Sequence, residues 1–191
     1  MPCRLAALAV LAAAGCATVP EAPVVVPDYV TSPASCALVL GGGGTVFPDE
    51  RVAQAWRKID GIVTDAATAE LSRLGYKVEQ VMSDAGTGAE RGRAAAVELA
   101  RRQCNRVVQL SHFVEGEPGA QKFGFAVSVL VPDATKARRV EGGIAYPFDQ
   151  TYARRYAYDL TSEMMDRLVP AEVGRQVAAD LDLARVLTGR K

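Results

Sequence analysis

The clearest alternation of apolar and polar positions lies between residues 123 and 131. Large apolar side chains occupy every second position: Phe123, Phe125, Val127, Val129 and Val131. Because side chains of a strand alternate between its two faces, this pattern predicts a strand with one large apolar face. Turn-forming residues 132–134 follow, and we predict that residues 138–146 return as the antiparallel hairpin partner of this strand.

Three other segments predict strands. The apolar run Ala37–Leu40 is closed by a run of glycines and indicates a buried strand. Residues 107–114 form a second apolar run, and residues 76–82 alternate more weakly. Segments with the spacing of helices lie between these predicted strands. From Pro48 to Leu74, apolar residues recur every three or four positions, and the capping-box spacing of Thr87 and Glu90 predicts a second helix that runs to about residue 103.

The last part of the chain shows four-residue steps. These steps join Tyr152, Tyr156, Leu160, Met164 and Leu168. We therefore predict a helix that is capped by Asp149 or Thr151 and ends at Pro170. A final amphipathic segment carries Val173, Val177, Leu181 and Leu187.

Strands that alternate with helices favour parallel pairing, and a late hairpin adds antiparallel strands to the same sheet. We expect an α/β fold with a mixed sheet of about five strands, flanked by helices in two or three layers, with C-terminal helices. Residues 36–191 have the size of one domain.

The start of the chain resembles a bacterial lipoprotein signal. Arg4 precedes an apolar run, Leu5–Ala14, which fits the roughly 7–15 residues of an export signal and is shorter than the roughly 20 of a transmembrane helix. The end of this run, up to Cys16, resembles a lipobox, although Ala13 stands where leucine is usual. The resemblance implies that residues 1–15 are removed and that Cys16 carries acyl chains. Ordinary signal cleavage, which leaves a secreted protein with a free Cys16, is the alternative.

Residues 16–35 are rich in proline and predict an extended tether. A contribution of Val24–Val26 to an edge strand is the alternative. In lipoproteins, an aspartate after the acylated cysteine marks retention in the inner membrane, and Ala17 stands here instead. By this resemblance the protein is held by its acyl chains at the periplasmic face of the outer membrane.

A resemblance to a known fold group rests on two short segments. They are Leu74–Val78, after the first helix, and residues 104–110, which open the third strand. With the order of elements, they resemble the TolB amino-terminal-domain group, which includes the penicillin-binding-protein activator LpoB and the flagellar protein FlgO. The resemblance implies a periplasmic lipoprotein of this fold and assigns no functional residue.

The chain carries 22 basic and 22 acidic residues. This balance provides no electrostatic footprint for nucleic acid, which requires a basic face. We therefore expect no nucleic-acid partner.

The glycine run is the first candidate for a ligand site. Its residues are Gly41, Gly42, Gly43, Gly44 and Thr45, between a predicted strand and a predicted helix. Phosphates bind at this place in α/β folds, but the run lacks the lysine of a phosphate-binding loop and the spacing of a dinucleotide motif. A tight or flexible turn is the favoured interpretation.

His112 is the single histidine of the chain. In a strand it shares a face with Val108 and Leu110, and one histidine cannot build a zinc site with several ligands. We interpret it as a structural residue. Tyr152 and Tyr156 are expected in the core, whereas Tyr158 is a candidate for an exposed position.

Cys36 and Cys104 each stand just before a predicted parallel strand. If the first and third strands are neighbours, both sulfur atoms lie at one edge of the sheet, within the reach of a disulfide. We predict this bridge, with two buried free thiols as the alternative.

No catalytic, metal-binding or cofactor-binding constellation emerges from the sequence. The resulting expectation is a non-enzymatic accessory or assembly factor that contacts other proteins of the cell envelope. A module that binds a small envelope ligand, such as a lipid or glycan fragment, near Gly41–Gly44 is the alternative, and an enzyme is the least favoured class. The oligomeric state and the identity of the partner stay open.

Overall fold

The computed structural model describes residues 36–84, 88–117, 119–136, 138–140, 143–145 and 147–187. The predicted signal, the predicted acylation site Cys16 and the predicted tether lie outside these residues. The helices and strands are β1 (Ala37–Gly44), α1 (Glu50–Arg73), β2 (Val78–Met82), α2 (Gly88–Arg102), β3 (Arg106–Glu115), β4 (Lys122–Pro132), η1 (Ala134–Lys136), β5 (Arg138–Val140), β6 (Gly143–Ala145), β7 (Phe148–Asp159), α3 (Ser162–Arg167) and α4 (Pro170–Leu183).

One mixed sheet organises the fold. Its five strands lie in the order β2-β1-β3-β4-β7. Strand β1 runs parallel to both β2 and β3, and β4 runs antiparallel to β3 and β7. The predicted α/β class with a mixed sheet is confirmed.

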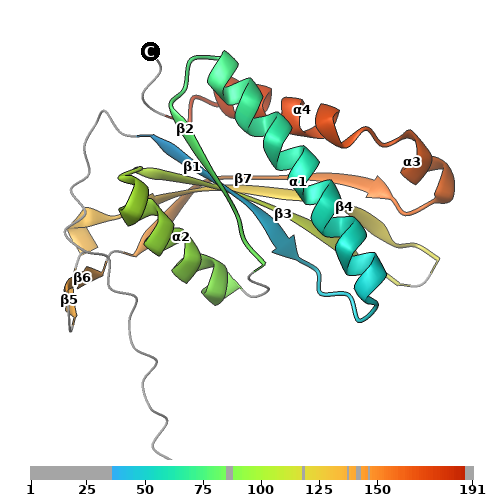
Figure 1. Cartoon of the computed structure of the whole chain (residues 1–191), viewed down its shortest axis with the longest axis horizontal. Coiled ribbons are helices and arrows are strands. Elements are labelled where there is room, and N and C mark those ends of the chain that lie inside the picture. Colours follow the sequence, from blue (N-terminus) through green and yellow to red (C-terminus); the bar gives the residue numbers. More distant parts are fainter. Residues whose placement is uncertain are drawn as a thin grey trace, which may run out of the picture.

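Helices cover both faces of the sheet. Helices α1 and α4 lie side by side on one face, and α2 lies on the other (Figure 1). The larger core lies between the sheet and helices α1 and α4, and it contains Phe123, Phe125, Val63 and Leu181. A smaller core lies under α2 and includes Leu38, Leu40 and Leu99.

Local sequence signals explain both ends of α1. Asp49 is the N-cap, and its side chain accepts a hydrogen bond from the Arg51 amide over 2.8 Å. This bond satisfies one of the amides that lack a partner in the first turn. Gly75 follows the C-terminal residues with a φ of 93°, a left-handed conformation that glycine adopts without strain. The predicted cap of α2, Thr87, lies outside the described residues.

A glycine allows α4 to pack closely on α1. A Cβ atom at Gly174 would overlap with the Val63 carbonyl oxygen of α1. Glycine at this position therefore sets the separation of the two helices.

The predicted helix from Asp149 or Thr151 to Leu168 is wrong. Residues 148–159 form β7, which pairs along the whole of β4, and only Ser162–Arg167 is helical there. The four-residue step between Tyr152 and Tyr156 is also twice the strand period, so it places both side chains on one face of a strand. All three tyrosines, Tyr158 included, pack against the larger core.

The predicted hairpin partner of residues 123–131 is also wrong. Within residues 138–146, β5 and β6 form a separate two-stranded sheet. Strand β5 has 3 residues and β4 has 11, whereas the 12 residues of β7 match the full length of β4. Long pairing of β4 with β7 uses more backbone hydrogen bonds than the short segment offers.

Pro170 begins a helix and does not end one. It occupies the first turn of α4, where proline fits because the amide it lacks has no helical partner there. The final amphipathic segment is confirmed, since Val173, Val177 and Leu181 are buried. Within the described residues, none of the helices combines the length and the apolar character that crossing a membrane requires.

Candidate functional site

The candidate site lies at the C-terminal edge of the parallel strands β1 and β3. From β1 the chain crosses through α1 on one face to β2, and it enters β3 from α2 on the other face (Figure 1). The two crossovers diverge between β1 and β3, where open α/β sheets commonly bind ligands. Residues 41–47, here called the glycine loop, comprise the irregular end of β1 and the three residues that follow it as the chain leaves the sheet. Together with α1 and β3 they line a pocket of about 220 Å³.

Close packing explains the glycines of this loop. The backbone of Gly42, Gly43 and Gly44 has φ angles of 87°, 71° and 121°, all in the left-handed range. A Cβ atom at Gly44 would overlap with the His112 carbonyl oxygen, and one at Gly41 would overlap with the Thr64 side chain of α1. The run that suggested a ligand loop or a turn is therefore the irregular end of β1, whose register with β3 shifts between Gly41 and Gly44, and it packs closely against α1 and β3.

His112 reaches this loop from β3. Its Nε2 atom lies 2.9 Å from the Thr45 carbonyl oxygen, and its Nδ1 atom lies 2.8 Å from an Asp60 carboxylate oxygen. Both side chains are buried, with 6% of His112 and 2% of Asp60 exposed. Burial raises the pKa of the Asp60 carboxyl, while the hydrogen bond to His112 and the charge of Arg91 act in the opposite direction.

Arg91 brings a second buried charge from α2. Its guanidinium donates to the Gly42 carbonyl oxygen and, over 3.5 Å, to the Leu110 carbonyl oxygen. Burial lowers the pKa of Arg91, which the carboxylate of Asp60 partly offsets. The glycine loop is thus held from two sides: His112 of β3, paired with Asp60 of α1, bonds the Thr45 carbonyl, and Arg91 of α2 bonds the Gly42 carbonyl.

Aromatic rings stack beside this cluster. The ring centroids of Trp56 and His112 lie 4.8 Å apart, and those of Phe47 and His112 lie 5.5 Å apart. Phe47 and Trp56 also stack on each other, at 5.9 Å. The imidazole therefore lies against the faces of two aromatic rings. Such faces attract cations, so they would stabilise the positively charged form of the imidazole.

Charged side chains line the mouth of the pocket. Arg57 and Glu50 form an ion pair on α1, and Arg57 lowers the pKa of the Glu50 carboxyl. Asp84, which follows β2, lines the same mouth. Within the part of the chain that the structure describes, no group of three or more histidine, cysteine, aspartate or glutamate side chains fits a metal ion.

This arrangement limits the chemistry of His112. Both ring nitrogens lie within hydrogen-bond distance of protein groups, so neither faces the pocket as a free acid or base. The mouth, with one guanidinium and two carboxylates, suits a small polar ligand.

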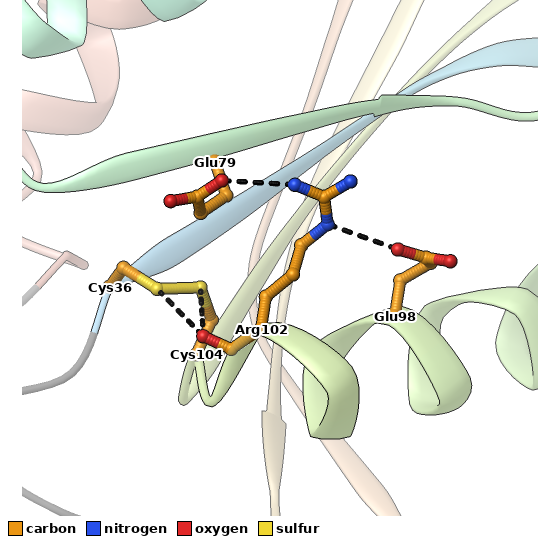
Figure 2. The surroundings of a disulfide bond; sticks show 5 residues. All are labelled: Cys36, Glu79, Glu98, Arg102 and Cys104. Carbon is orange, nitrogen blue, oxygen red and sulfur yellow. Dashed lines mark hydrogen bonds and ion pairs between the residues drawn. A yellow bond between two sulfur atoms is a disulfide. The ribbon is translucent and has the colours of Figure 1, made fainter.

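The two cysteines form the predicted disulfide at the opposite edge of the sheet. Cys36 and Cys104 are bonded, with their Cα atoms 4.4 Å apart (Figure 2). The amide of Asn105 donates to the Cys36 carbonyl oxygen over 3.0 Å, which continues the pairing of β1 with β3. Arg102 lies beside the bridge and forms ion pairs with Glu98 and Glu79.

Sequence patterns predicted a possible ligand loop or turn at Gly41–Thr45 and a structural role for His112, and the structure brings these residues together. Asp60 and Arg91 were not predicted. The signal for both is a charged residue at a position of helical spacing that otherwise holds core residues: Asp60 lies four residues after Trp56, and Arg91 lies four residues before Ala95. Cys16, the predicted site of acylation, lies outside the described residues.

No family model matches the chain, and no curated protein matches it. Among solved structures, it is similar to a dodecamer of a PelC point variant from Paraburkholderia phytofirmans, with 16% identity over 78% of this chain and 88% of the other, at a TM-score of 0.33. A putative neuraminyllactose-binding hemagglutinin homolog from Helicobacter pylori has 8% identity over 84% and 88%, with a TM-score of 0.37. The hypothetical protein CT253 from Chlamydia trachomatis has 14% identity over 80% and 96%, with a TM-score of 0.35.

Proposed function

We propose that this protein is a lipid-anchored accessory factor of the bacterial cell envelope, which acts through contacts with other proteins and not as an enzyme. The proposed location is the periplasmic face of the outer membrane, with Cys16 as the anchor. The sequence resemblance to the TolB amino-terminal-domain group points to the same kind of protein. Fold resemblance alone does not establish a function, so the proposal depends on the features of this chain.

The observation that carries the proposal is the disulfide between Cys36 and Cys104. Disulfides form and persist in exported proteins and are rare in reducing compartments. The bond therefore supports export, in agreement with the lipobox-like sequence that ends at Cys16. The occupied ring nitrogens of His112 favour a binding role over acid–base catalysis.

The two edges of the sheet suggest how the domain is presented. The predicted tether joins the domain at Cys36, at the edge where β1 and β3 begin. The glycine loop lies at the other edge, and its Val46 side chain is 78% exposed. We infer that the tether holds the first edge toward the membrane and that the glycine loop faces the partner.

A photo-crosslinking amino acid at Val46 tests this proposal in cells. Leu183 provides the matched control, because it is 82% exposed and lies near the tether edge, where Asp182 accepts a hydrogen bond from Tyr76 just before β2. We expect one defined envelope protein to be crosslinked from position 46 and not from position 183. The same adduct should disappear when Cys16→Ser releases the protein from membranes.

Two results would contradict the proposal. One is a Cys16→Ser protein that sediments with outer membranes as the wild type does. The other is equal labelling of unrelated proteins from positions 46 and 183.

The binding of a small envelope ligand is the second candidate function. The pocket of about 220 Å³ at the divergence of the two crossovers favours it. Native mass spectrometry of the protein purified from envelopes distinguishes this case. A co-purifying lipid or glycan fragment, lost when Arg57 and Glu50 are replaced together by alanine, would support ligand binding.

A further inference from the structure

The hydrogen bonds of His112 determine where its protons lie. A carbonyl oxygen only accepts hydrogen bonds, so the contact of Nε2 with the Thr45 carbonyl requires a proton on Nε2. The contact of Nδ1 with the Asp60 carboxylate over 2.8 Å requires a second proton, on either the nitrogen or the oxygen. Without that proton, a nitrogen lone pair and an anionic oxygen would face each other.

This second proton is held in a buried place. Only 2% of Asp60 is exposed, and burial raises the pKa of its carboxyl. The charged groups that face the pair are Arg91 from α2, Arg57 and Glu50 from α1, and Asp84 after β2. Arg91 is the buried one among these four, and it is fixed to carbonyl oxygens of the loop and of β3.

We propose that the proton shared by Asp60 and His112 is a pH-sensitive latch on the glycine loop. While it is present, the ring donates from Nε2 to Thr45 and is bonded to Asp60 through Nδ1. When the pH rises, this proton leaves to solvent. The ring then keeps one proton, which can serve Thr45 or Asp60 but not both. The attraction to the buried carboxylate favours Nδ1, so the Thr45 carbonyl loses its donor.

Release of Thr45 changes the candidate pocket. Thr45 and Phe47 both line it, and Phe47 stacks on the His112 ring. The hydroxyl of Thr45 also accepts a hydrogen bond from the Val114 amide over 2.8 Å, so the loop is tied to β3 at a second point. The latch thus sets the position of one wall of the pocket without unfolding the loop. This inference does not depend on the proposed partner.

Two residues of the chain can report on the latch separately. It contains one histidine and one tryptophan, and the two rings stack at 4.8 Å. Nitrogen NMR of the full-length protein in detergent, labelled with ¹⁵N-histidine, reports which ring nitrogens are protonated. We expect a proton in each of the two hydrogen bonds at low pH, and loss of the proton shared by the pair in one step as the pH is raised. Amide signals of residues 43–47 and Trp56 fluorescence should change in the same step, and protection of the loop amides should fall by roughly tenfold, the worth of one buried hydrogen bond.

Two variants separate the latch from general pH effects. In Asp60→Asn, the amide donates to Nδ1 at every pH, so the step in the loop signals should vanish. Asp84→Asn removes a carboxylate of the pocket mouth and should leave the step unchanged. A bare Nε2 on the acid side of the step, loop signals that do not change across the step, or the absence of any step would overturn the proposal. The wild-type spectra alone decide the matter if Asp60→Asn fails to fold.

Discussion

The carboxylate of Asp60 and the imidazole of His112 lie 2.8 Å apart, although 52 residues separate them in the chain. Asp60 belongs to α1 and His112 to β3, so the contact ties a helix to a central strand inside the larger core. Charged side chains are rarely buried to this degree unless they are paired. Removal of one member of the pair is therefore expected to lower stability strongly.

Asp60→Ala should lower the free energy of unfolding by about 1–3 kcal/mol, because it leaves the partner nitrogen of His112 buried without a hydrogen bond. Asp60→Asn keeps a donor for that nitrogen and should cost about 1 kcal/mol. Urea unfolding followed by Trp56 fluorescence measures both. Asp65→Ala, at an exposed position of the same helix, is the control and should cost less than about 1 kcal/mol. Equal losses for all three variants would show that the pair contributes little.

The protonation of Asp60 should make the stability of the protein depend on pH. Its pKa is raised by burial above the ordinary 3.8, so the folded protein binds more protons than the unfolded chain between the two values. The stabilisation that comes from the proton on Asp60 is therefore fully present below the pKa of the unfolded chain. It is lost as the pH rises through the pKa of the folded protein, by at most about 1.4 kcal/mol per pH unit. Urea midpoints measured over a pH series should show this slope in the wild type and not in Asp60→Asn. Parallel curves for the two proteins would argue against it.

Replacing Cys36 and Cys104 together by serine should lower the free energy of unfolding by about 4 kcal/mol in the chain-entropy model. The bond closes a segment with a sequence separation of 68 residues, and its loss frees the unfolded chain. In the wild type, mass spectrometry after alkylation without reductant should find neither of these cysteines labelled, and labelling should appear after reduction. Two labelled cysteines in the unreduced protein would contradict the bond.

Two glycines provide a matched pair of substitutions. Gly44→Ala should destabilise the protein by more than about 2 kcal/mol, because φ is 121° and a Cβ atom would overlap with the His112 carbonyl oxygen. Gly61→Ala in α1 meets no atom within 4 Å and should stabilise the helix by about 1 kcal/mol. Thermal unfolding of both variants measures the difference. A neutral Gly44→Ala would mean that the loop can move away from β3.

Periodicity predicted most of the fold because its strands and helices bury one face each. Residues 37–40 and 123–131 were assigned correctly, and the register argument for Cys36 and Cys104 succeeded because β1 and β3 are parallel neighbours. Residues 148–159 were misassigned, since a step of four residues fits both a helix and a strand. The missing information was which segment lies beside β4, since the sequence pattern does not specify that β7 pairs along its whole length.

The candidate site was harder to predict than the fold. Asp60 lies among core positions of α1, and a periodicity argument that counts apolar residues passes over it. Its partner His112 is distant in sequence, and only the crossing of α1 over β3 brings them together. Local sequence supplied the glycine loop, whereas the buried charges that hold it depend on tertiary contacts.

The position of the disulfide also determines how the domain bears tension. A pull on the chain before residue 36 reaches β1 through the peptide backbone and β3 through the bond between Cys36 and Cys104. The two strands run parallel from Ala37 and Arg106, so both are drawn in the same direction at once. Mechanical load applied at this end therefore does not shear the hydrogen bonds between β1 and β3, and their register is preserved under strain.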